Sequence, residues 1–581
     1  MPELLRRFAI PYRTAFIIGP LTKLIEVLFD LATPLVIAHM VDAGIAAGDV
    51  SSVLRDGALL AVMALVAILI VLICQKMAAR ASMGIGTALR GALYRHINRL
   101  SCEDAEAFGT PSLVTRCTSD VNQIQLAVAL AIRQLVRWPL LAAGSVIATM
   151  LIDVRLGAAF LVAVVLVVAA FFVVMRRSIP LFVRVQEGLD GVARIVREGL
   201  SGARVVRALG RGGYERERLV RAVDAQVESS IEVGAWSSTL NPVTLLVMNL
   251  AVCAVLVLGG IRVDAGELTQ GDVVAFVNYA TQALLSIVYV ANLAIVFNKA
   301  QASARRVIEV LDATPSITDP AHPLVPDMEG APAIRFDGVS YSYKEAPAPA
   351  VDGVSLVVPA GSTIGVIGGT GSGKTTLAEL VSRTRDASSG SVEVFGADVR
   401  DWRLADLHSS VAVVPQSPSL VSGTIRSNLL WRDALADDAE LWRALEAAQA
   451  AEFVRSMEFG LDSPVDAGGR NLSGGQRQRL TIARALVGGP AILIMDDAAS
   501  ALDAKTDARL RSSLRALSSS SQGMRMTTMV ISQRIASVRA ADAICVMEAG
   551  RVVGIGTHGE LYRSCPVYRE ICASQEVGID G

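Results

Sequence analysis

Residues 364–375 read Ile364-Gly-Val-Ile-Gly-Gly-Thr-Gly-Ser-Gly-Lys-Thr375. Their first part is an apolar run, which predicts a buried strand. The second part has the Gly-x4-Gly-Lys-Thr spacing of a phosphate-binding loop that opens a helix. Glycines are needed there because backbone N–H groups wrap phosphate oxygens with no Cβ in the way. This stretch therefore predicts an α/β nucleotide-binding domain.

The polar residues of the loop have separate expected tasks. Lys374 supplies positive charge to the outer phosphates, Thr375 offers its hydroxyl to Mg²⁺, and the helix from Thr376 directs its positive end at the same anion. The residues of this loop that we expect to contact ATP are Gly368, Gly369, Thr370, Gly371, Ser372, Gly373, Lys374, Thr375 and Thr376.

Two further motifs extend this chemistry. Residues 491–495 form a second apolar run, which predicts a buried strand that delivers Asp496 to the metal. Residues 472–476 read Leu-Ser-Gly-Gly-Gln and open a helix, so its N-terminus is a second phosphate site. Its expected contacts are Ser473, Gly474, Gly475 and Gln476. One nucleotide can use both helix ends only if they come from two subunits that face each other.

The first half of the chain is more apolar than the second. Of the 581 residues, 52% are hydrophobic and 19% are charged. A membrane span needs roughly 20 apolar residues, and four apolar runs and two charge-bearing runs are long enough. These runs are Gly57–Cys74, Gly157–Met175, Pro242–Ile261, Val273–Phe297, 14–40 and 126–152. We therefore expect an all-α domain of six membrane-spanning helices.

The connections between these runs alternate in length and charge. Those near 41–56, 153–156 and 262–272 carry few Lys or Arg, whereas the long stretches 76–125 and 176–235 carry many. The positive-inside bias places the long stretches and both termini in the cytoplasm. Because each long stretch is compatible with helix, we expect helices that project well beyond the bilayer of the cell (plasma) membrane.

Charged residues lie within two of the predicted spans. Glu26 and Asp30 share one helical face, and Arg133 and Arg137 share a face of another span at similar depth. The favoured interpretation is interhelical salt bridging that joins the two spans. The alternative is a polar wall of a substrate cavity.

The remaining composition sets the domain boundaries and excludes several classes. Residues 1–312 are expected to form the transmembrane domain, 313–332 a Pro-rich linker, and 333–575 the nucleotide-binding domain. The net charge of −1 gives no sign of nucleic-acid binding. The seven cysteines form no Cys-x-x-Cys pair, which disfavours a disulfide or zinc framework. Met1–Tyr12 is a poor signal peptide and predicts an amphipathic helix on the membrane surface.

With these motifs together, the chain resembles an ATP-binding cassette (ABC) half-transporter of the exporter type, in which six spans are fused to one nucleotide-binding domain. The resemblance implies that Tyr343 stacks on adenine and that Gln416 senses Mg²⁺ and contacts the membrane domain. It implies that Ser500–Asp503, with Asp503, forms a loop that reaches across the subunits. It also implies that the tips at Phe108–Leu113 and Leu200–Arg204 are coupling helices that dock into the nucleotide-binding domains.

Two catalytic positions depart from the family pattern. The family places a Glu after the metal-binding Asp as general base, and this chain has Asp497, which is one methylene shorter. The family places a His before Arg534, and this chain has Gln533, which has no titratable proton. The pattern resembles the degenerate-site subunit of a heterodimeric exporter. The intact Leu472–Gln476 would then complete the hydrolytic site of a different half-transporter subunit.

The leading hypothesis is ATP-driven export of an amphipathic compound, whether a drug, a lipid or a peptide. Two alternatives within the same fold are a regulatory or channel-like protein that barely hydrolyses ATP, and an importer. Substrate contacts, if any, are expected from aromatic residues of the spans, although packing is the more common role of such residues. These aromatic residues are Phe29, Trp138, Trp236, Tyr279, Tyr289 and Phe297.

Overall fold

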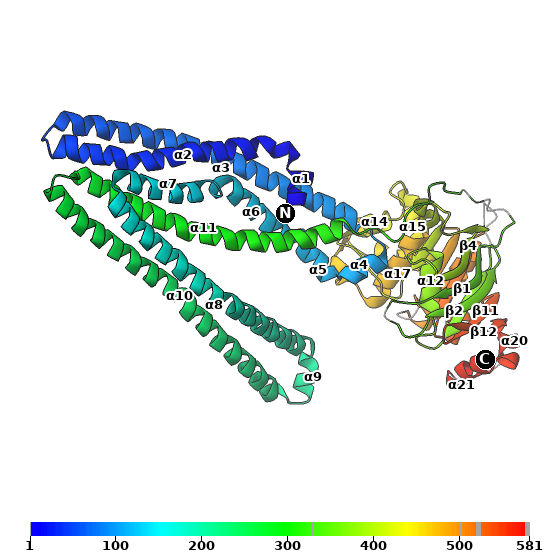
Figure 1. Cartoon of the computed structure of the whole chain (residues 1–581). Coiled ribbons are helices and arrows are strands. Elements are labelled where there is room, and N and C mark those ends of the chain that lie inside the picture. The colour runs from blue at the N-terminus through cyan, green and yellow to red at the C-terminus, as the bar shows by residue number, and fades with distance from the viewer. Residues whose placement is uncertain are drawn as a thin grey trace. The chain divides into compact units, whose positions relative to one another are not determined.

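The computed structural model describes residues 2–324, 326, 330–344, 346–498, 502–518 and 525–575. The chain divides into two compact units (Figure 1). The helical unit comprises Met1–Asn98 and Thr110–Ala313, and the sheet unit comprises Arg99–Gly109 and Thr314–Gly581. Part of the linker predicted at 313–332 lies outside the described residues, namely 325 and 327–329.

Six helical segments of the described chain are long and apolar enough to cross a membrane, and they contain the six predicted runs. Their main helices are α2 (Arg13–His39), α3 (Val50–Ile97), α6 (Val121–Gln134) with α7 (Arg137–Ile152), α8 (Val154–Ser201), α10 (Gly212–Asp264) and α11 (Gln270–Leu311). Shorter helices are α1 (Pro2–Phe8), α5 (Thr110–Thr115) and α9 (Ala203–Ala208). Helix α8 has 48 residues, so it is about 72 Å long and far exceeds a hydrocarbon layer of roughly 30 Å.

The short connections between spans are stabilised by capping side chains. Asp49 accepts a hydrogen bond from the backbone N–H of Ser51 at the start of α3. Asp153 accepts one of 2.8 Å from the N–H of Leu156 at the start of α8, and Thr269 caps α11. Each cap satisfies N–H groups that the first helical turn leaves unpaired.

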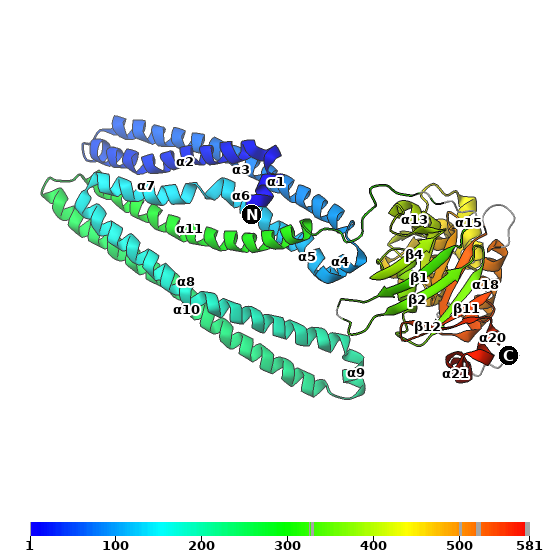
Figure 2. The same cartoon turned by 45° about the vertical axis from the view of Figure 1, so that its right-hand side comes forward.

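Helices α8 and α10 lie side by side as a long hairpin in both views of the molecule (Figure 2). Toward α9 this pair separates from the other long helices of the helical unit. The tip is exposed and carries both apolar and basic side chains: Leu200, Val205 and Leu209 are 75%, 61% and 69% exposed, and Arg204 and Arg207 are exposed beside them. The second tip predicted at Leu200–Arg204 therefore corresponds closely to α9 (Ala203–Ala208). The first, predicted at Phe108–Leu113, spans the junction between α4 (Cys102–Phe108) and α5.

The predicted interhelical ion pairs within the spans form for Arg137 but not for Arg133. Arg137 lies 3.2 Å from Glu26 and 3.0 Å from Asp30, and Lys23 also pairs with Glu26. The prediction for Arg133 was wrong, because its guanidinium donates to Gln75 instead. The physical reason is the break between α6 and α7 at residues 135–136, since a proline at 139 removes the helical hydrogen bond to residue 135.

The sheet unit contains a six-stranded sheet in the order β12-β11-β3-β10-β9-β6. Its strands are β3 (Thr363–Gly368), β6 (Val411–Val414), β9 (Ile492–Asp496), β10 (Thr527–Ser532), β11 (Ala543–Glu548) and β12 (Arg551–Gly556). All the pairings are parallel except that of β12 with β11. Strand β10 lies between β3 and β9, with Ile531 opposite both Val366 and Asp496. The ends of the strands that carry the two predicted phosphate and metal motifs therefore meet at one edge.

A smaller antiparallel sheet has the order β2-β1-β4-β5. Its strands are β1 (Ile334–Tyr341), β2 (Val351–Val358), β4 (Ser389–Val394) and β5 (Ala397–Asp398), and β7 (Gly423–Thr424) pairs separately with β8 (Pro464–Val465). The other helices of the sheet unit are α12 (Lys374–Val381), α13 (Leu404–Ser410), α14 (Ile425–Leu429), α15 (Asp438–Ala447), α16 (Ala451–Arg455), α17 (Gly474–Leu486), α18 (Ala504–Ser518), α19 (Ile535–Val538), α20 (His558–Ser564) and α21 (Pro566–Ser574).

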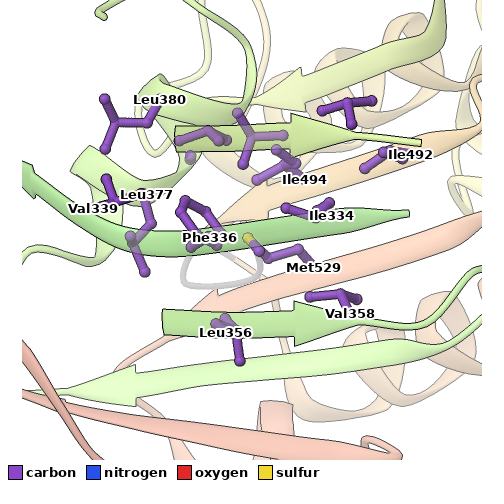
Figure 3. Packing of buried hydrophobic residues seen from close by; sticks show 14 of the residues in the cluster. Ile334, Phe336, Val339, Leu356, Val358, Leu377, Leu380, Ile492, Ile494 and Met529 are labelled. Atoms are coloured by element: carbon purple, nitrogen blue, oxygen red, sulfur yellow. The ribbon is translucent and has the colours of Figure 1, made fainter. Parts of the chain in front are cut away.

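One apolar core joins the two sheets through α12. Phe336 of β1, Leu377 of α12 and Ile494 of β9 belong to the same buried cluster (Figure 3). A second buried cluster includes Leu445 and Leu480 and joins α15 to α17. The first core holds the phosphate-loop helix against the sheet, and the second holds the helix that begins with the Leu-Ser-Gly-Gly-Gln motif.

Candidate functional site

A cavity of about 290 Å³ lies at the edge where β3, β9 and β10 end. Most of its lining comes from three chain segments: the loop between β3 and α12 with the start of α12, the end of β9, and the end of β10. Its lining residues are Tyr343, Ala350, Thr370, Gly371, Ser372, Gly373, Lys374, Thr375, Thr376, Gln416, Asp496, Asp497, Ile531, Ser532 and Gln533. Loops after the carboxyl ends of parallel strands are the common ligand site of such sheets.

The loop itself has the geometry expected of a phosphate cradle. Gly373 has φ +94°, and a Cβ there would lie 2.2 Å from the carbonyl oxygen of Ala350, so only glycine fits. The amine of Lys374 donates to the carbonyl oxygens of Gly368 and Gly369 at 3.0 and 2.6 Å. Burial lowers the pKa of Lys374, while the charges of the two nearby carboxylates oppose that shift. Additional negative charge from phosphate oxygens would strengthen the preference for the ammonium form.

Asp496 ends strand β9 and is buried. Burial raises its pKa, although a hydrogen bond from the Thr375 hydroxyl acts in the opposite direction. A carboxylate and a hydroxyl side by side are the hard oxygen ligands that Mg²⁺ prefers, so Asp496 and Thr375 fit that ion. Gln416 lines the same cavity.

Asp497 and Gln533 line the cavity at the ends of neighbouring strands. The backbone of Asp497 has φ +48°, in the left-handed region that Asp tolerates better than most residues. Its N–H donates to the carbonyl oxygen of Ile531 at 2.8 Å, and the hydroxyl of Ser532 lies 3.5 Å from its carboxylate. The structure thus brings together the two residues that depart from the family pattern.

Tyr343 also lines the cavity and lies shortly after β1. Its hydroxyl lies 3.2 Å from Thr376 Oγ1 and 3.3 Å from Glu379 Oε2, both on α12. The guanidinium of Arg385 lies 4.9 Å from the centroid of its ring. The ring is therefore held in place from both the phosphate helix and a buried arginine.

The Leu-Ser-Gly-Gly-Gln motif lies elsewhere in the sheet unit. Ser473 and Gln476 form a reciprocal capping box at the start of α17, with hydrogen bonds of 2.9 and 3.3 Å. Among the lining residues of the described cavity, none comes from Ser473–Gln476, and Asp503 is also not one of them. Asp503 accepts a hydrogen bond from the N–H of Thr506 at 3.0 Å, and hydrogen bonding with Thr506 lowers its pKa. Residues 500 and 501 of the same loop lie outside the described residues.

Sequence reasoning missed several contributors to this site. Ala350, Ile531 and Ser532 line the cavity, and Arg385 with Glu379 supports the ring of Tyr343. The position of β10 beside the phosphate-loop strand would have indicated Ile531 and Ser532. Nothing in the local sequence indicates Arg385, because its contacts depend on the fold.

The aromatic residues of the spans have packing contacts. Trp138 stacks on Tyr289 with ring centroids 4.1 Å apart, and Phe297 packs against the same cluster. Tyr279 is fully buried and donates its hydroxyl to the carbonyl oxygen of Leu31. Trp236 lies 5.5 Å from the guanidinium of Arg177. These contacts agree with packing, the more common role of aromatic residues on spans.

A second hollow, of about 380 Å³, lies on the sheet unit outside the first cavity. Its lining includes His408, Ser409, Trp431, Arg432 and Arg484. Trp431 is 67% exposed, which is unusual for so large an apolar side chain. We name this hollow the Trp431 groove.

Comparisons with known proteins agree with this geometry. Residues 16–287 match the family of the ABC transporter transmembrane region, and residues 351–500 match the ABC transporter family. Over 577 residues the chain is 36% identical to an uncharacterized ABC transporter ATP-binding protein of Mycobacterium tuberculosis (strain CDC 1551 / Oshkosh), covering 99% of this chain and 98% of that protein.

Two relatives with functional names are also similar. The ATP-dependent lipid A-core flippase of Desulfotalea psychrophila is 32% identical over 483 residues, which cover 81% of each chain. The multidrug efflux ATP-binding/permease protein of Mycobacterium tuberculosis (strain H37Rv) is 32% identical over 489 residues, which cover 83% of this chain and 40% of that protein.

The fold is similar to that of a bacterial Atm1-family ABC exporter with ATP bound, with a TM-score of 0.78 and 23% identity over the whole of both chains. Six candidate spans and one sheet-containing domain on a single polypeptide match the half-transporter architecture. The chain belongs to the ABC transporter family.

Proposed function

We propose that this chain is one subunit of a heterodimeric, ATP-driven exporter of amphipathic compounds. It holds ATP in its own cavity, at a site with little hydrolytic activity, and lends Ser473–Gln476 to the hydrolytic site of a different half-transporter. The observation that carries the proposal is that Asp497 and Gln533 line one cavity with an intact phosphate loop, while the intact signature motif lies outside it.

The two departures bear on hydrolysis rather than on binding. A general base must lie within about 3 Å of the attacking water. The shorter side chain of Asp497 withdraws the carboxylate by roughly one bond, and a misplacement of about 1 Å can cost ~100-fold in rate. Gln533 can donate a hydrogen bond to a phosphate oxygen but offers no titratable proton.

Mg²⁺ would be held by Thr375 and Asp496, with Gln416 nearby, and would supply neutralising charge to the phosphate oxygens when bound. The chain's own contribution is to orient the phosphates through Lys374 and the loop N–H groups. Tyr343, which lines the same cavity, would stack on adenine.

The pairing of subunits is supported at the cytoplasmic tip as well. Leu200, Val205 and Leu209 are exposed among arginines at the tip of the helical unit, and an exposed Trp431 marks a groove on the sheet unit. Apolar surfaces of this kind are typical of binding sites between proteins. We assign the Trp431 groove as the receptor for α9 of the partner subunit.

The proposed cargo class and membrane follow from the relatives and the topology. Two relatives that are 32% identical over the aligned residues are named as a lipid A-core flippase and as a multidrug efflux protein, and an amphipathic compound is the cargo class we propose from them. The proposed location is the cell membrane, with the sheet unit and both termini in the cytoplasm, in accordance with the positive-inside bias.

Photolabelling of the purified pair tests the division of labour. The pair is allowed to turn over 8-azido-ATP that carries ³²P at either the α or the γ position, and is then irradiated and separated on a gel. We expect this chain to carry both labels, because its nucleotide stays intact, and the partner to lose the γ label. Equal loss of the γ label from both chains would contradict the proposal.

Transport by inside-out membrane vesicles tests the direction. The vesicles should accumulate an amphipathic dye when ATP is added, and a Trp431→Asp variant should reduce accumulation more than ATP turnover, because it disturbs docking rather than chemistry. Accumulation only in right-side-out vesicles would indicate an importer.

A further inference from the structure

The side chain of Arg385 joins three parts of the sheet unit. Arg385 is only 6% exposed. Its guanidinium donates to Glu379 of α12 at 2.8 Å and to Glu106 of α4 at 2.9 Å. It also lies 4.9 Å from the centroid of the Tyr343 ring. One buried cation therefore contacts the phosphate helix, the cytoplasmic helix α4 and the aromatic wall of the nucleotide cavity.

These contacts form a closed set around the ring. The hydroxyl of Tyr343 lies 3.3 Å from the same Glu379 oxygen that Arg385 contacts. Arg385 also donates to the hydroxyl of Tyr341, whose ring meets that of Tyr343 edge to face at 5.0 Å. A displacement of the guanidinium would disturb both the hydrogen bond and the ring contact that orient Tyr343.

Helix α4 presents three acids to the sheet unit. Glu106 pairs with Arg385, and Glu103 pairs at 2.9 Å with Lys344, the residue next to Tyr343. Asp104 accepts a hydrogen bond of 2.9 Å from the N–H of Ser316. Burial alone would raise the pKa of Asp104, but the hydrogen bonds from Ser316 and Ser101 outweigh it and lower the pKa. Helix α4 is thus linked to Lys344 by the ion pair of Glu103, and to Tyr343 indirectly, through the ion pair of Glu106 with Arg385.

We propose that Arg385 is a positioning residue that makes the binding of the adenine base at Tyr343 and the seating of α4 depend on each other. The inference rests on the proposed nucleotide site. Without Glu106, the buried guanidinium loses one of its two carboxylate partners and shifts toward Glu379, and the ring it supports shifts with it. The dependence is reciprocal, because any factor by which α4 changes base affinity is the factor by which the base changes α4 seating. Since α4 is linked covalently to α3 and α5, movement of the spans would reach the base through Arg385.

A double-mutant cycle in the full-length assembled transporter tests this. The variants are Arg385→Gln, Glu106→Gln and the combination, and the readout is the concentration of α-³²P 8-azido-ATP that half-labels this chain, measured in EDTA. Each single variant should raise that concentration about threefold to tenfold. The combination should be no worse than the poorer single variant, because both remove the same link. Inorganic tripolyphosphate, which has no base, is used to displace the label. Its affinity for the site, calculated from that competition, should be the same in the wild type and in all variants.

Arg383→Gln is the matched control, since Arg383 is also 6% exposed and pairs with Asp386 instead. It should leave half-labelling unchanged. If Arg385→Gln fails to fold, Glu106→Gln still decides, because Glu106 is 65% exposed and its loss spares the fold. If the wild-type chain takes the label but Glu106→Gln has no effect on half-labelling, or the effects of the two substitutions are fully additive, the role of Arg385 is overturned. The proposed nucleotide site would still stand. A wild-type chain that takes no label would instead refute the proposed nucleotide site, and the inference with it.

Discussion

The N-termini of α12 and α17 are both suited to phosphate, but their surroundings differ. Helix α12 begins inside a cavity that also holds Tyr343 and two carboxylates. Helix α17 begins at Ser473 and Gly474, which are exposed and satisfied by their own capping box. The start of α12 lines this cavity together with Asp497 and Gln533, whereas Ser473–Gln476 are not among the residues that line it. The difference is what the proposed division of labour would require, with the second end serving a nucleotide that another subunit holds.

The largest expected effect on ATP turnover comes from a substitution at the start of α17. Ser473→Ala in the assembled pair should lower ATP turnover by about 100-fold, because in the proposed pair it removes a hydroxyl that would donate to the γ-phosphate held by the partner. It should leave labelling of this chain's own cavity unchanged. Part of the change is the loss of a helix cap, worth ~1 kcal/mol of stability. Thr557→Ala is the control, since Thr557 forms the same capping box with Glu560 on α20, and it should leave turnover intact.

An intermediate effect is expected at α12. Lys374→Ala should weaken ATP binding to this chain by about tenfold or more, since it removes a charge-assisted hydrogen bond. Turnover of the pair should fall by less than about tenfold, because the proposed hydrolytic site would use the partner's phosphate loop. If Lys374→Ala abolished turnover while Ser473→Ala spared it, the roles of the two helix ends would be reversed.

The smallest effect sharpens the comparison by making the two sites alike. Asp497→Glu with Gln533→His should raise turnover of the pair by about twofold, since a second site then acquires a base and a titratable switch residue. The backbone φ of +48° at position 497 is less favourable for Glu than for Asp, so a slight loss of stability should accompany the gain. Unchanged turnover in a folded variant would show that these two residues do not set the rate.

Much of this fold was predictable from the sequence because its signals are local. The apolar runs gave the six candidate spans, and the glycine spacing at 368–375 gave a loop whose Gly373 accepts no Cβ. Asp496 and Asp497 were placed at the end of a predicted strand, and parallel pairing of β9 with β10 brings them close to Gln533. In each case the residue pattern and the structural requirement lie within a few positions of each other.

One of the missed features had a local signal, and another depends on a contact between distant segments. The break between α6 and α7 separates Arg133 from Arg137, and the proline at 139 was a signal for it that an assumption of one continuous helix overlooked. The link from Glu106 to Arg385 joins residues 279 positions apart, and no periodicity announces such a pair. Charged residues on a surface helix are solvated in most cases. Only the fold shows that the acids of α4 pair with Lys344 and Arg385.

ATP turnover by this chain purified alone, compared with turnover by the same amount of chain in its pair, tests the central claim most directly. We expect the chain alone to turn over ATP about 100-fold more slowly, as estimated from the withdrawn carboxylate of Asp497, although it still takes the photolabel. Turnover by the chain alone equal to that of the pair would contradict the division of labour between the two helix ends.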